Sequence, residues 1–262
     1  MAGLGIFSWF SYVLPMQERL RLIRQAGFDA TSLWWGDEEE EKHSLPELAR
    51  KVGLELDNLH APCRNPNDLW REGSDGAEYL DVLRACIADC RRHGIPTVVV
   101  HVTRLSVRPA VTPLGIDRLK RLVDFAEQNE VNVALENLNS IPHLDAVYAA
   151  IPSARLGFCY DSGHEHCNHP QADCLSRYGS RLFAVHLHDN FGEDDTHLLP
   201  FDGTITWQMQ MEKLKTCRPI RFLTLEADFN RSHPKSALYQ NLPAADFLSL
   251  ACARLRTLQA FS

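Results

Sequence analysis

Hydrophobic and polar residues follow two repeating patterns along this chain, and the shorter pattern predicts β-strands. In short runs rich in Val, Ile, Leu and Phe, successive side chains alternate in character, which is typical of a strand because neighbouring side chains point to opposite faces. Eight such runs are expected, at Gly3–Trp9, Phe28–Trp35, Glu55–His60, Thr97–Thr103, Asn132–Leu138, Leu156–Asp161, Leu182–His188 and Arg221–Ala227.

Segments with helical spacing of their apolar residues lie between these strands. Examples are "MQERLRLIRQAG", "AEYLDVLRACIADCRRHG" and "IDRLKRLVDFAEQN", and the first two end at Gly27 and Gly94, as expected where a helix stops. Strands that alternate with helices without any break in composition favour a closed parallel barrel. The 262 residues leave little room beyond the roughly 250 of a typical barrel. We therefore expect an α/β fold, a single (β/α)8 TIM-barrel domain over residues 1–262.

The alternation also predicts which side chains line the barrel interior. In "LFAVHLHD", Phe183, Val185 and Leu187 share one face, while Ala184, His186 and His188 share the other. The consistently apolar face of each strand should pack against the outer helices, so the second face should point inward.

The inward face carries residues that can bind metal at six consecutive strand ends. These residues are His60, His101, Glu136, Asp161, His186 and Glu226. The carboxyl ends of the strands are where barrel enzymes place their chemistry. Burying so many ionisable groups together is costly unless something compensates their charge. A divalent cation is the simplest compensation, and we therefore predict a metal site at this rim.

Each of these residues also has an ordinary structural interpretation. His101 alone could be a hydrogen-bonded core histidine, and Glu136 or Glu226 could each be half of a buried salt bridge. Asp161 could do no more than cap the helix that follows it in "DSGHEH". Independent structural roles would not place all of them at matching depth, so the joint arrangement favours the site.

Two local patterns add candidate ligands. Asp161 and His164 form a D-x-x-H turn, and Asp195 and His197 form a D-x-H in the loop after the seventh strand, which should fold back over His186. His188 shares the face of His186 and could either contact substrate or hydrogen-bond within the loop. Asp189 is expected to orient one of the histidines.

Aromatic and basic residues beyond the strand ends are candidates for substrate contact. Trp34, with Trp9, Phe10 and Trp35, could stack on a sugar ring or could simply pack. Arg231, with Arg64, Arg104 and Arg108, could hold a phosphate or carboxylate, or could be solvated. The run "WWGDEEEEK" is interpreted as an exposed acidic segment.

The composition of the chain narrows the kinds of molecule that it is expected to bind. The net charge of −7 argues against a broad nucleic-acid-binding face. No secretion signal and no apolar run long enough for a membrane span is present, so neither secretion nor a membrane partner is expected. The eight cysteines include no CxxC pair and are interpreted as free thiols in a reducing cytoplasm.

The motifs "LENL", "YDSGH", "HLHDN", "DTH" and "TLEA" resemble those of the xylose-isomerase-like barrel superfamily, in order and over nearly the whole chain. That group includes sugar and sugar-phosphate isomerases and epimerases, together with endonuclease IV. The epimerase branch implies one Mn²⁺ or related ion held by Glu136, Asp161, His186 and Glu226, with His164 at the substrate. The endonuclease branch implies three zinc ions and adds His60, His101, His164, Asp195 and His197 to the same four ligands.

Two loops depart from the endonuclease pattern, namely "LNSIPHL" after Glu136-Asn137 and "VTRLSVRPAV" after His101. Sugar chemistry is therefore ranked first: isomerisation or epimerisation of a small-molecule sugar through an enediolate, with Glu136 and Glu226 moving the proton. Zinc-dependent phosphodiester hydrolysis and a non-catalytic metal-binding barrel are the alternatives. Because barrels of this kind often pair, a homo-oligomer is left open.

Overall fold

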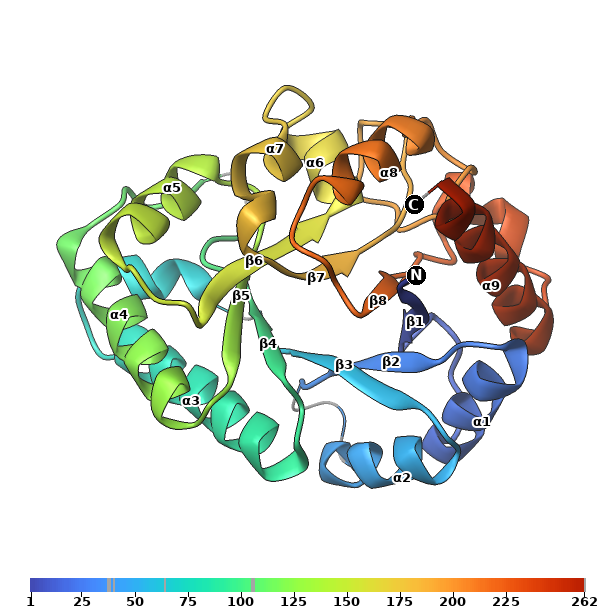
Figure 1. Ribbon diagram of the computed structural model, residues 1–262, viewed down its shortest axis with the longest axis horizontal. Helices are drawn as coiled ribbons and strands as arrows, with labels where there is room; N and C mark the ends of the chain where they lie inside the picture. The colour runs from blue at the N-terminus through green and yellow to red at the C-terminus, as the bar shows by residue number, and fades with distance from the viewer. Residues whose placement is uncertain (37–38, 40, 64, 105–106, 262) are drawn as a thin grey trace.

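A barrel of parallel strands forms the centre of the computed structural model, which describes residues 1–36, 39, 41–63, 65–104 and 107–261 (Figure 1). The strands lie in the order β7-β6-β5-β4-β3-β2-β1-β8. Their bounds are β1 Gly3–Phe7, β2 Ala30–Trp34, β3 Glu55–His60, β4 Thr97–Val100, β5 Asn132–Glu136, β6 Leu156–Asp161, β7 Leu182–His186 and β8 Phe222–Leu225. Each of the eight expected strands is confirmed, and several end earlier than expected because the rim loops begin there.

Backbone hydrogen bonds between the first and last members of this order close the barrel. The Leu187 N–H donates to the Thr224 carbonyl at 2.8 Å, and the Glu226 N–H donates to the Leu187 carbonyl at 3.1 Å. These bonds join the end of β7 to β8, so the sheet is nearly closed on itself. The predicted single (β/α)8 TIM barrel is confirmed.

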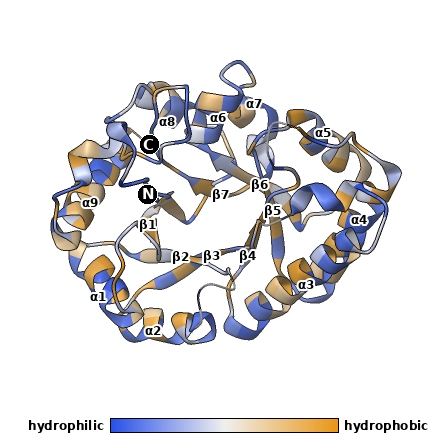
Figure 2. Cartoon of the chain, turned by 180° about the vertical axis from the view of Figure 1, so that it is seen from behind, coloured by the Kyte–Doolittle hydropathy of each residue, from blue (hydrophilic) through white to orange (hydrophobic). Residues whose placement is uncertain are grey.

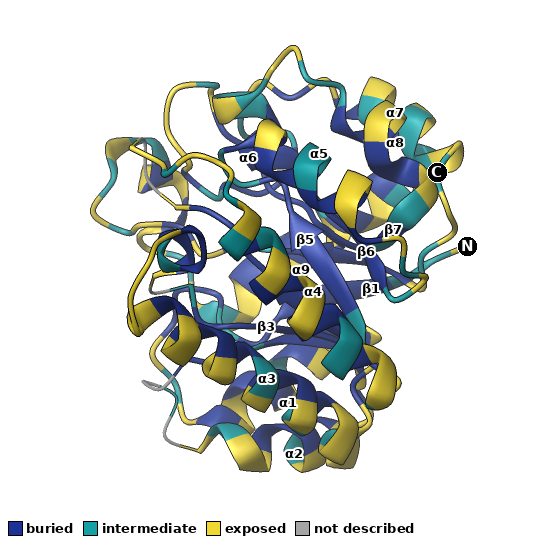
Figure 3. Cartoon of the chain, turned by 90° about the vertical axis from the view of Figure 1, so that its left-hand side faces the viewer, coloured by how far each residue is buried: buried dark blue, intermediate teal, exposed yellow. Residues whose placement is uncertain are grey.

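Helices that carry both hydrophobic and hydrophilic residues surround the barrel (Figure 2), and their buried faces lie toward the strands while their exposed faces lie outward (Figure 3). They are α1 Met16–Ala26, α2 Leu45–Lys51, α3 Asp75–His93, α4 Pro113–Gln128, α5 Ile141–Ala150, α6 Ser162–Asn168, α7 Cys174–Tyr178, α8 Trp207–Lys215 and α9 Ala244–Phe261. Short 3₁₀ turns are η1 Lys42–Ser44, η2 Pro66–Trp70, η3 Gly179–Arg181 and η4 Pro234–Tyr239. The expected stops of α1 and α3 are confirmed, because Gly27 (φ 101°) and Gly94 (φ 62°) adopt the left-handed conformation.

The barrel interior below the rim is filled by a small cluster of buried side chains, Val99, Ala134, Cys159 and Ala184. These belong to the face that the alternation predicts to point inward. Phe183 was expected to face the helices, and that expectation is wrong: its ring packs against this same cluster. The pairing of β6 with β7 shifts register between Phe158 and Cys159, which removes the strict alternation there.

All eight cysteines are free thiols, as predicted. Within the part of the chain that the structure describes, no helix combines the length and apolar character that a membrane span needs.

Candidate metal centre

Side chains from four neighbouring strand ends converge at the carboxyl rim of the barrel. Glu136, Asp161 and His186 are the last residues of β5, β6 and β7, and Glu226 directly follows β8. Each offers one ligand atom, and these atoms all lie within 4.8 Å of one another. We refer to these residues as the four-ligand group. Parallel strands that end at one rim bring together residues far apart in the chain, as the alternation predicted.

Glu136 lies at the middle of the centre, and its carboxylate is fully buried. Oε2 is 3.2 Å from His60 Nε2 and 2.9 Å from His101 Nε2, so a second group of ligand atoms forms on that side. Oε1 is 3.1 Å from His164 Nδ1 and 3.3 Å from His186 Nδ1. Glu136 is therefore shared between the four-ligand group and the pair His60 and His101.

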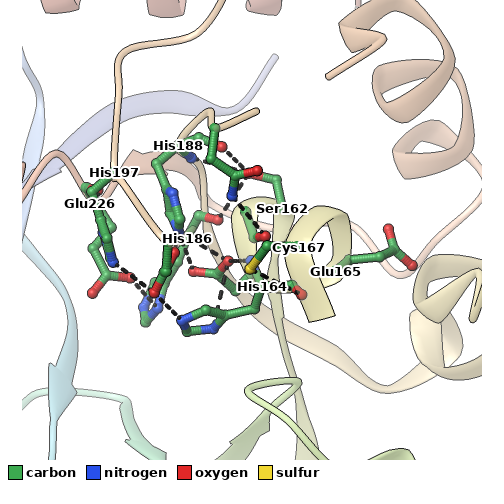
Figure 4. Close-up of polar contacts among 12 residues, drawn as sticks. Ser162, His164, Glu165, Cys167, His186, His188, His197 and Glu226 are labelled. Carbon is green, nitrogen blue, oxygen red and sulfur yellow. Dashed lines mark hydrogen bonds and ion pairs between the residues drawn. The ribbon is translucent and has the colours of Figure 1, made fainter. Parts of the chain in front are cut away.

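A third group of ligand atoms comes from the loop after β7 and from α6. It consists of His164, His188, Asp195 and His197. An oxygen of the Asp195 carboxylate lies 3.1 Å from His164 Nε2 and 3.1 Å from His197 Nε2. Figure 4 shows His164, His186, His197 and Glu226 gathered in one region, with dashed polar contacts between them. The loop thus folds back over His186, as expected from the D-x-H pattern.

Two histidines are oriented by backbone carbonyls in the way that metal ligands usually are. His60 Nδ1 donates to the Ala61 carbonyl at 2.9 Å, and His197 Nδ1 donates to the Glu226 carbonyl at 3.0 Å. Each bond fixes the tautomer and leaves Nε2, which faces a carboxylate, without a proton in the neutral ring. A lone pair on each ring therefore points into the centre.

Asp161 stabilises the turn that begins α6 and also contacts the candidate ligand His188. One oxygen accepts the His164 backbone N–H at 2.6 Å, so Asp161 caps α6, and the other is 3.1 Å from His188 Nε2. Asn137, which the sequence analysis did not select, clamps Asp161 through two backbone hydrogen bonds of 2.7 and 2.8 Å. The signal was its position directly after Glu136. Asp161 therefore does more than cap a helix.

Asp189 does not orient a histidine, and that expectation is wrong. Its buried carboxylate accepts hydrogen bonds from the backbone N–H groups of Asn190, Phe201 and Ile205 and from the Trp207 indole, at 2.8 to 3.1 Å. Its backbone also pairs with Leu198. Asp189 thus stabilises the loop that presents Asp195 and His197, and acts on the centre through that loop.

Opposite charges in the centre shift the pKa values of its members. Burial lowers the pKa of His101, but the charge of Glu136 and the hydrogen bonds to Cys63 and Glu136 together outweigh burial and raise that pKa to about 9. Burial likewise opposes the charged form of His164, yet Asp161 and Asp195 raise its pKa well above the usual value. Because a metal ligand must be a neutral imidazole, a cation that binds here would displace these protons.

The residues fit a divalent metal. Four ligand atoms are buried and have no hydrogen-bond partner among the described residues: Glu136 Oε1, His164 Nδ1, His186 Nδ1 and Glu226 Oε2. These four atoms lie close to one another. For example, His186 Nδ1 is 3.1 Å from Glu226 Oε2. Unpartnered buried polar atoms are rare in proteins. Their mixture of imidazole nitrogen and carboxylate oxygen suits ions such as Zn²⁺ and Mn²⁺.

A cavity of about 620 Å³ opens above the centre, and His101, His164, Asp195, His197 and Glu226 contribute to its lining. A second cavity of about 500 Å³ shares its Trp34 and Glu226 walls and adds Trp9 and Glu39. Asp228 also lines both and accepts a hydrogen bond from the Trp9 indole at 2.7 Å. Asp228 was not among the residues predicted from the sequence, although its spacing of two from Glu226 is the signal that could have identified it.

The structure places some of the candidate substrate-contact residues at the cavity and others away from it. Trp34 lines the cavity, as do Arg104 and Arg108 on the wall near His101. Arg231 lies outside both cavity linings: its guanidinium stacks 4.0 Å from the Tyr12 ring and donates to the Ser11 carbonyl. Phe10 and Trp35 belong to the buried core. The substrate role expected of Arg231 stays a prediction, and Arg64 lies outside the described residues.

His188 is fully buried, and its ring stacks on His197 at a centroid distance of 3.9 Å. Its Nε2 lies 3.0 Å from an Asp161 oxygen. These contacts place His188 among the candidate ligands, and His188 lines neither of the two cavities. A substrate contact by His188 stays a prediction.

Comparisons with known proteins agree with this architecture. Residues 20–239 match the family described as xylose isomerase-like TIM barrel. Uncharacterized protein y4fM of Sinorhizobium fredii is 30% identical over 233 residues, which cover 73% of this chain and 74% of that protein. Uncharacterized protein MJ1311 of Methanocaldococcus jannaschii is 32% identical over 187 residues, or 65% of this chain and 64% of that protein.

Solved structures share the fold at low sequence identity. L-ribulose 3-epimerase superposes with a TM-score of 0.77 at 20% identity, over 100% of this chain and 94% of the other. D-psicose 3-epimerase from Clostridium cellulolyticum H10, solved with D-tagatose, gives 0.79 at 12% identity over 99% of both chains. The IOLI protein with a bound zinc atom gives 0.73 at 16% identity, over 98% of this chain and 96% of the other.

Proposed function

This chain belongs to the xylose isomerase-like TIM barrel family, and from that premise we propose that it is a divalent-metal-dependent isomerase or epimerase of sugars or sugar phosphates. The observation that carries the proposal is the four-ligand group, whose member Glu226 lines a cavity of about 620 Å³. A cavity of this size accommodates a small molecule. The proteins of similar fold named L-ribulose 3-epimerase and D-psicose 3-epimerase support this substrate class.

Glu136, Asp161, His186 and Glu226 would hold the metal. When bound, a divalent ion at this position supplies Lewis-acid polarisation of a carbonyl and stabilises negative charge that develops beside it. The hydrogen bonds of Asp161 to α6 and to Asn137 keep that ligand in place without the ion. This set is the same as the one implied by the epimerase resemblance.

Glu226 is the carboxylate that we assign to proton transfer. Its side chain is 15% exposed and lines the cavity, whereas the Glu136 side chain is fully buried beneath the histidines. A general base must come within hydrogen-bond reach of the proton that it removes. The position of Glu226 at the cavity wall favours it for this role, and the proton-transfer roles of both Glu226 and Glu136 stay predictions. His164, also at the cavity surface, would bind a substrate oxygen.

Deuterium exchange tests the proposal. Chelator-treated protein is reloaded with Mn²⁺, incubated in heavy water with a panel of ketoses and ketose phosphates, and the recovered sugars are analysed by mass spectrometry. We expect deuterium on the carbon beside the carbonyl of at least one sugar, and none after the metal is removed again. Metal-loaded protein that exchanges no proton on any member of the panel would contradict the proposal.

One observation favours a second candidate function, phosphodiester hydrolysis. Beyond the four-ligand group, His60 and His101 share Glu136, and His164, His188, Asp195 and His197 form a further group. Clustered metal ions that clamp attacking and leaving oxygens are typical of phosphodiesterases. Except for His188, these residues are the ones that the endonuclease IV resemblance adds.

Metal counting separates these functions. An epimerase that uses the four-ligand group alone is expected to retain one Mn²⁺ or related ion per chain at full activity. Three zinc ions firmly bound by these rim residues, together with cleavage of an oligonucleotide that contains an abasic site, would establish the hydrolase instead. Bound metal without turnover of sugars or phosphodiesters would leave a non-catalytic metal-binding barrel.

Arg104 and Arg108 predict a preference for phosphorylated substrates. Both line the cavity, and each donates to a backbone carbonyl, of Cys63 and Asn139 respectively, which holds the guanidinium at the wall. We expect Arg104→Gln or Arg108→Gln to lower kcat/KM for a ketose phosphate by about 10- to 100-fold, as loss of a charged hydrogen bond does.

The free ketose supplies the contrast for this prediction, because its kcat/KM should change little in either variant. Arg231→Gln is the matched control, since Arg231 stacks on Tyr12 outside the cavity. Equal losses for the free and the phosphorylated sugar would show that these arginines do not read a phosphate.

A further inference from the structure

A second cluster of metal-capable side chains lies outside the barrel rim, between η1 and α3. We call it the outer cluster: His43 in η1, with Asp89 and His93 in α3. Asp89 and His93 are four residues apart, so they share one face of the helix. Each residue offers one ligand atom, and these atoms lie within 4.8 Å of one another. None of the three belongs to the groups of the candidate metal centre.

The Asp89 carboxylate is held in an orientation that leaves one oxygen for a ligand. The Trp35 indole N–H donates to Oδ2 at 2.9 Å, while Oδ1 faces His43 Nδ1 at 3.9 Å. The Asp89 side chain is 19% exposed, so it is partly withdrawn from water. A carboxylate fixed by a neighbouring N–H donor is the arrangement that commonly supports a metal ligand.

The two imidazoles are placed by the same tryptophan. The Trp35 ring lies 5.4 Å from the His43 ring and 5.9 Å from the His93 ring, and the two imidazoles are 6.0 Å apart. His93 Nε2 is buried and has no hydrogen-bond partner among the described residues. A buried imidazole nitrogen without a partner is unusual, and it is one of the atoms that this ring can offer to an ion.

We infer that the outer cluster is a second, separate binding site for a zinc-class divalent cation, with His43, Asp89 and His93 as its protein ligands. Two imidazole nitrogens and one carboxylate oxygen are a set that favours Zn²⁺ over Mg²⁺ or Ca²⁺. Zinc is commonly four-coordinate, so water would complete the site.

The bound ion would cross-link the segment before α2 to the last turns of α3. Trp35 directly follows Trp34, which lines the cavity of the metal centre. The outer site would thus stabilise the base of one cavity wall without contributing any atom to the reaction.

Metal counting in variants of the full chain tests this inference. Chelator-treated wild type, His43→Ala and His93→Ala are equilibrated with Zn²⁺, passed through gel filtration and analysed for zinc by mass spectrometry. We expect each variant to retain one zinc fewer per chain than wild type. His233→Ala is the matched control, because His233 is also a partly exposed histidine beside an aspartate, at 3.7 Å from Asp194, and it should retain the wild-type count.

Thermal melting in chelator separates loss of the site from loss of the fold. The His43 side chain is 53% exposed, so His43→Ala should melt as wild type does without metal but gain less stability on addition of Zn²⁺. Trp35→Phe keeps an aromatic ring and removes the N–H that holds Asp89, and should weaken zinc binding at this site by roughly 10- to 100-fold. Equal zinc counts and equal zinc-induced stabilisation in wild type, His43→Ala and His93→Ala would overturn the inference.

Discussion

Glu226→Gln is expected to reduce turnover by about 10²- to 10⁴-fold, the contribution of a positioned acid–base group. Glutamine keeps the size of the side chain and an oxygen that can face a metal, but it cannot accept the substrate proton. Because Glu226 is one of four ligands, most of the metal should stay bound. The decisive measurement is the rate at which deuterium enters the sugar from heavy water, normalised to the metal content of each preparation.

Glu136→Gln should behave differently from Glu226→Gln. Glu136 touches His60, His101, His164 and His186 at 2.9 to 3.3 Å, so its loss should deplete the metal as well as the activity. Glu39→Gln is the matched control, because Glu39 lines the smaller cavity together with Glu226 but pairs with Arg19 at 3.0 Å. Full exchange activity in both Glu136→Gln and Glu226→Gln would rule out these roles.

Asp189→Ala is expected to lower the free energy of unfolding by at least about 3 kcal/mol, because several buried donors to a charged acceptor lose their partner at once. Three backbone N–H groups and the Trp207 indole donate to this carboxylate. The alanine side chain accepts no hydrogen bond and leaves the space of the carboxylate empty. Urea unfolding followed by circular dichroism measures the change.

The same variant should also loosen the ligands that the loop carries. Asp195 and His197 lie between Asp189 and Phe201, and His197 is held at a φ of 47°, a conformation that the surrounding structure must enforce. Asp194→Ala is the matched control, since its side chain is 62% exposed and its loss should change stability by less than about 0.5 kcal/mol. Equal stability of the two variants would show that Asp189 does not organise this loop.

The barrel fold and the convergence of the four-ligand group could be predicted from the sequence. Eight alternating runs fix the strands, and their period of two places Glu136, Asp161 and His186 on inward faces at matching depth. A parallel barrel has a single carboxyl rim, so these residues must meet there once the barrel closes. The observed groups of ligand atoms within 4.8 Å agree with that expectation, while the catalytic and metal-binding roles stay predictions.

Contacts made by loop residues could not be predicted from the sequence. Asp189 serves the backbone of its own loop, His188 lies beneath His197, and Arg231 stacks on Tyr12. Phe183 turned inward because the pairing of β6 with β7 shifts register. No periodicity predicts such partners, because loop residues follow no repeating geometry and their neighbours come from distant parts of the chain.

The sequence by itself determined the order of the strands and helices, the inward face of the strand ends that carry ionisable residues and the rim at which those residues collect, because the repeat of side-chain direction along a strand is a local property of the backbone. Tertiary structure alone decided that Glu136 is shared between two groups of candidate ligands, that Glu226 faces the cavity and that His43 lies beside Asp89 and His93 of α3. Those facts depend on distances between segments remote in the chain, and only the closed and packed barrel sets such distances.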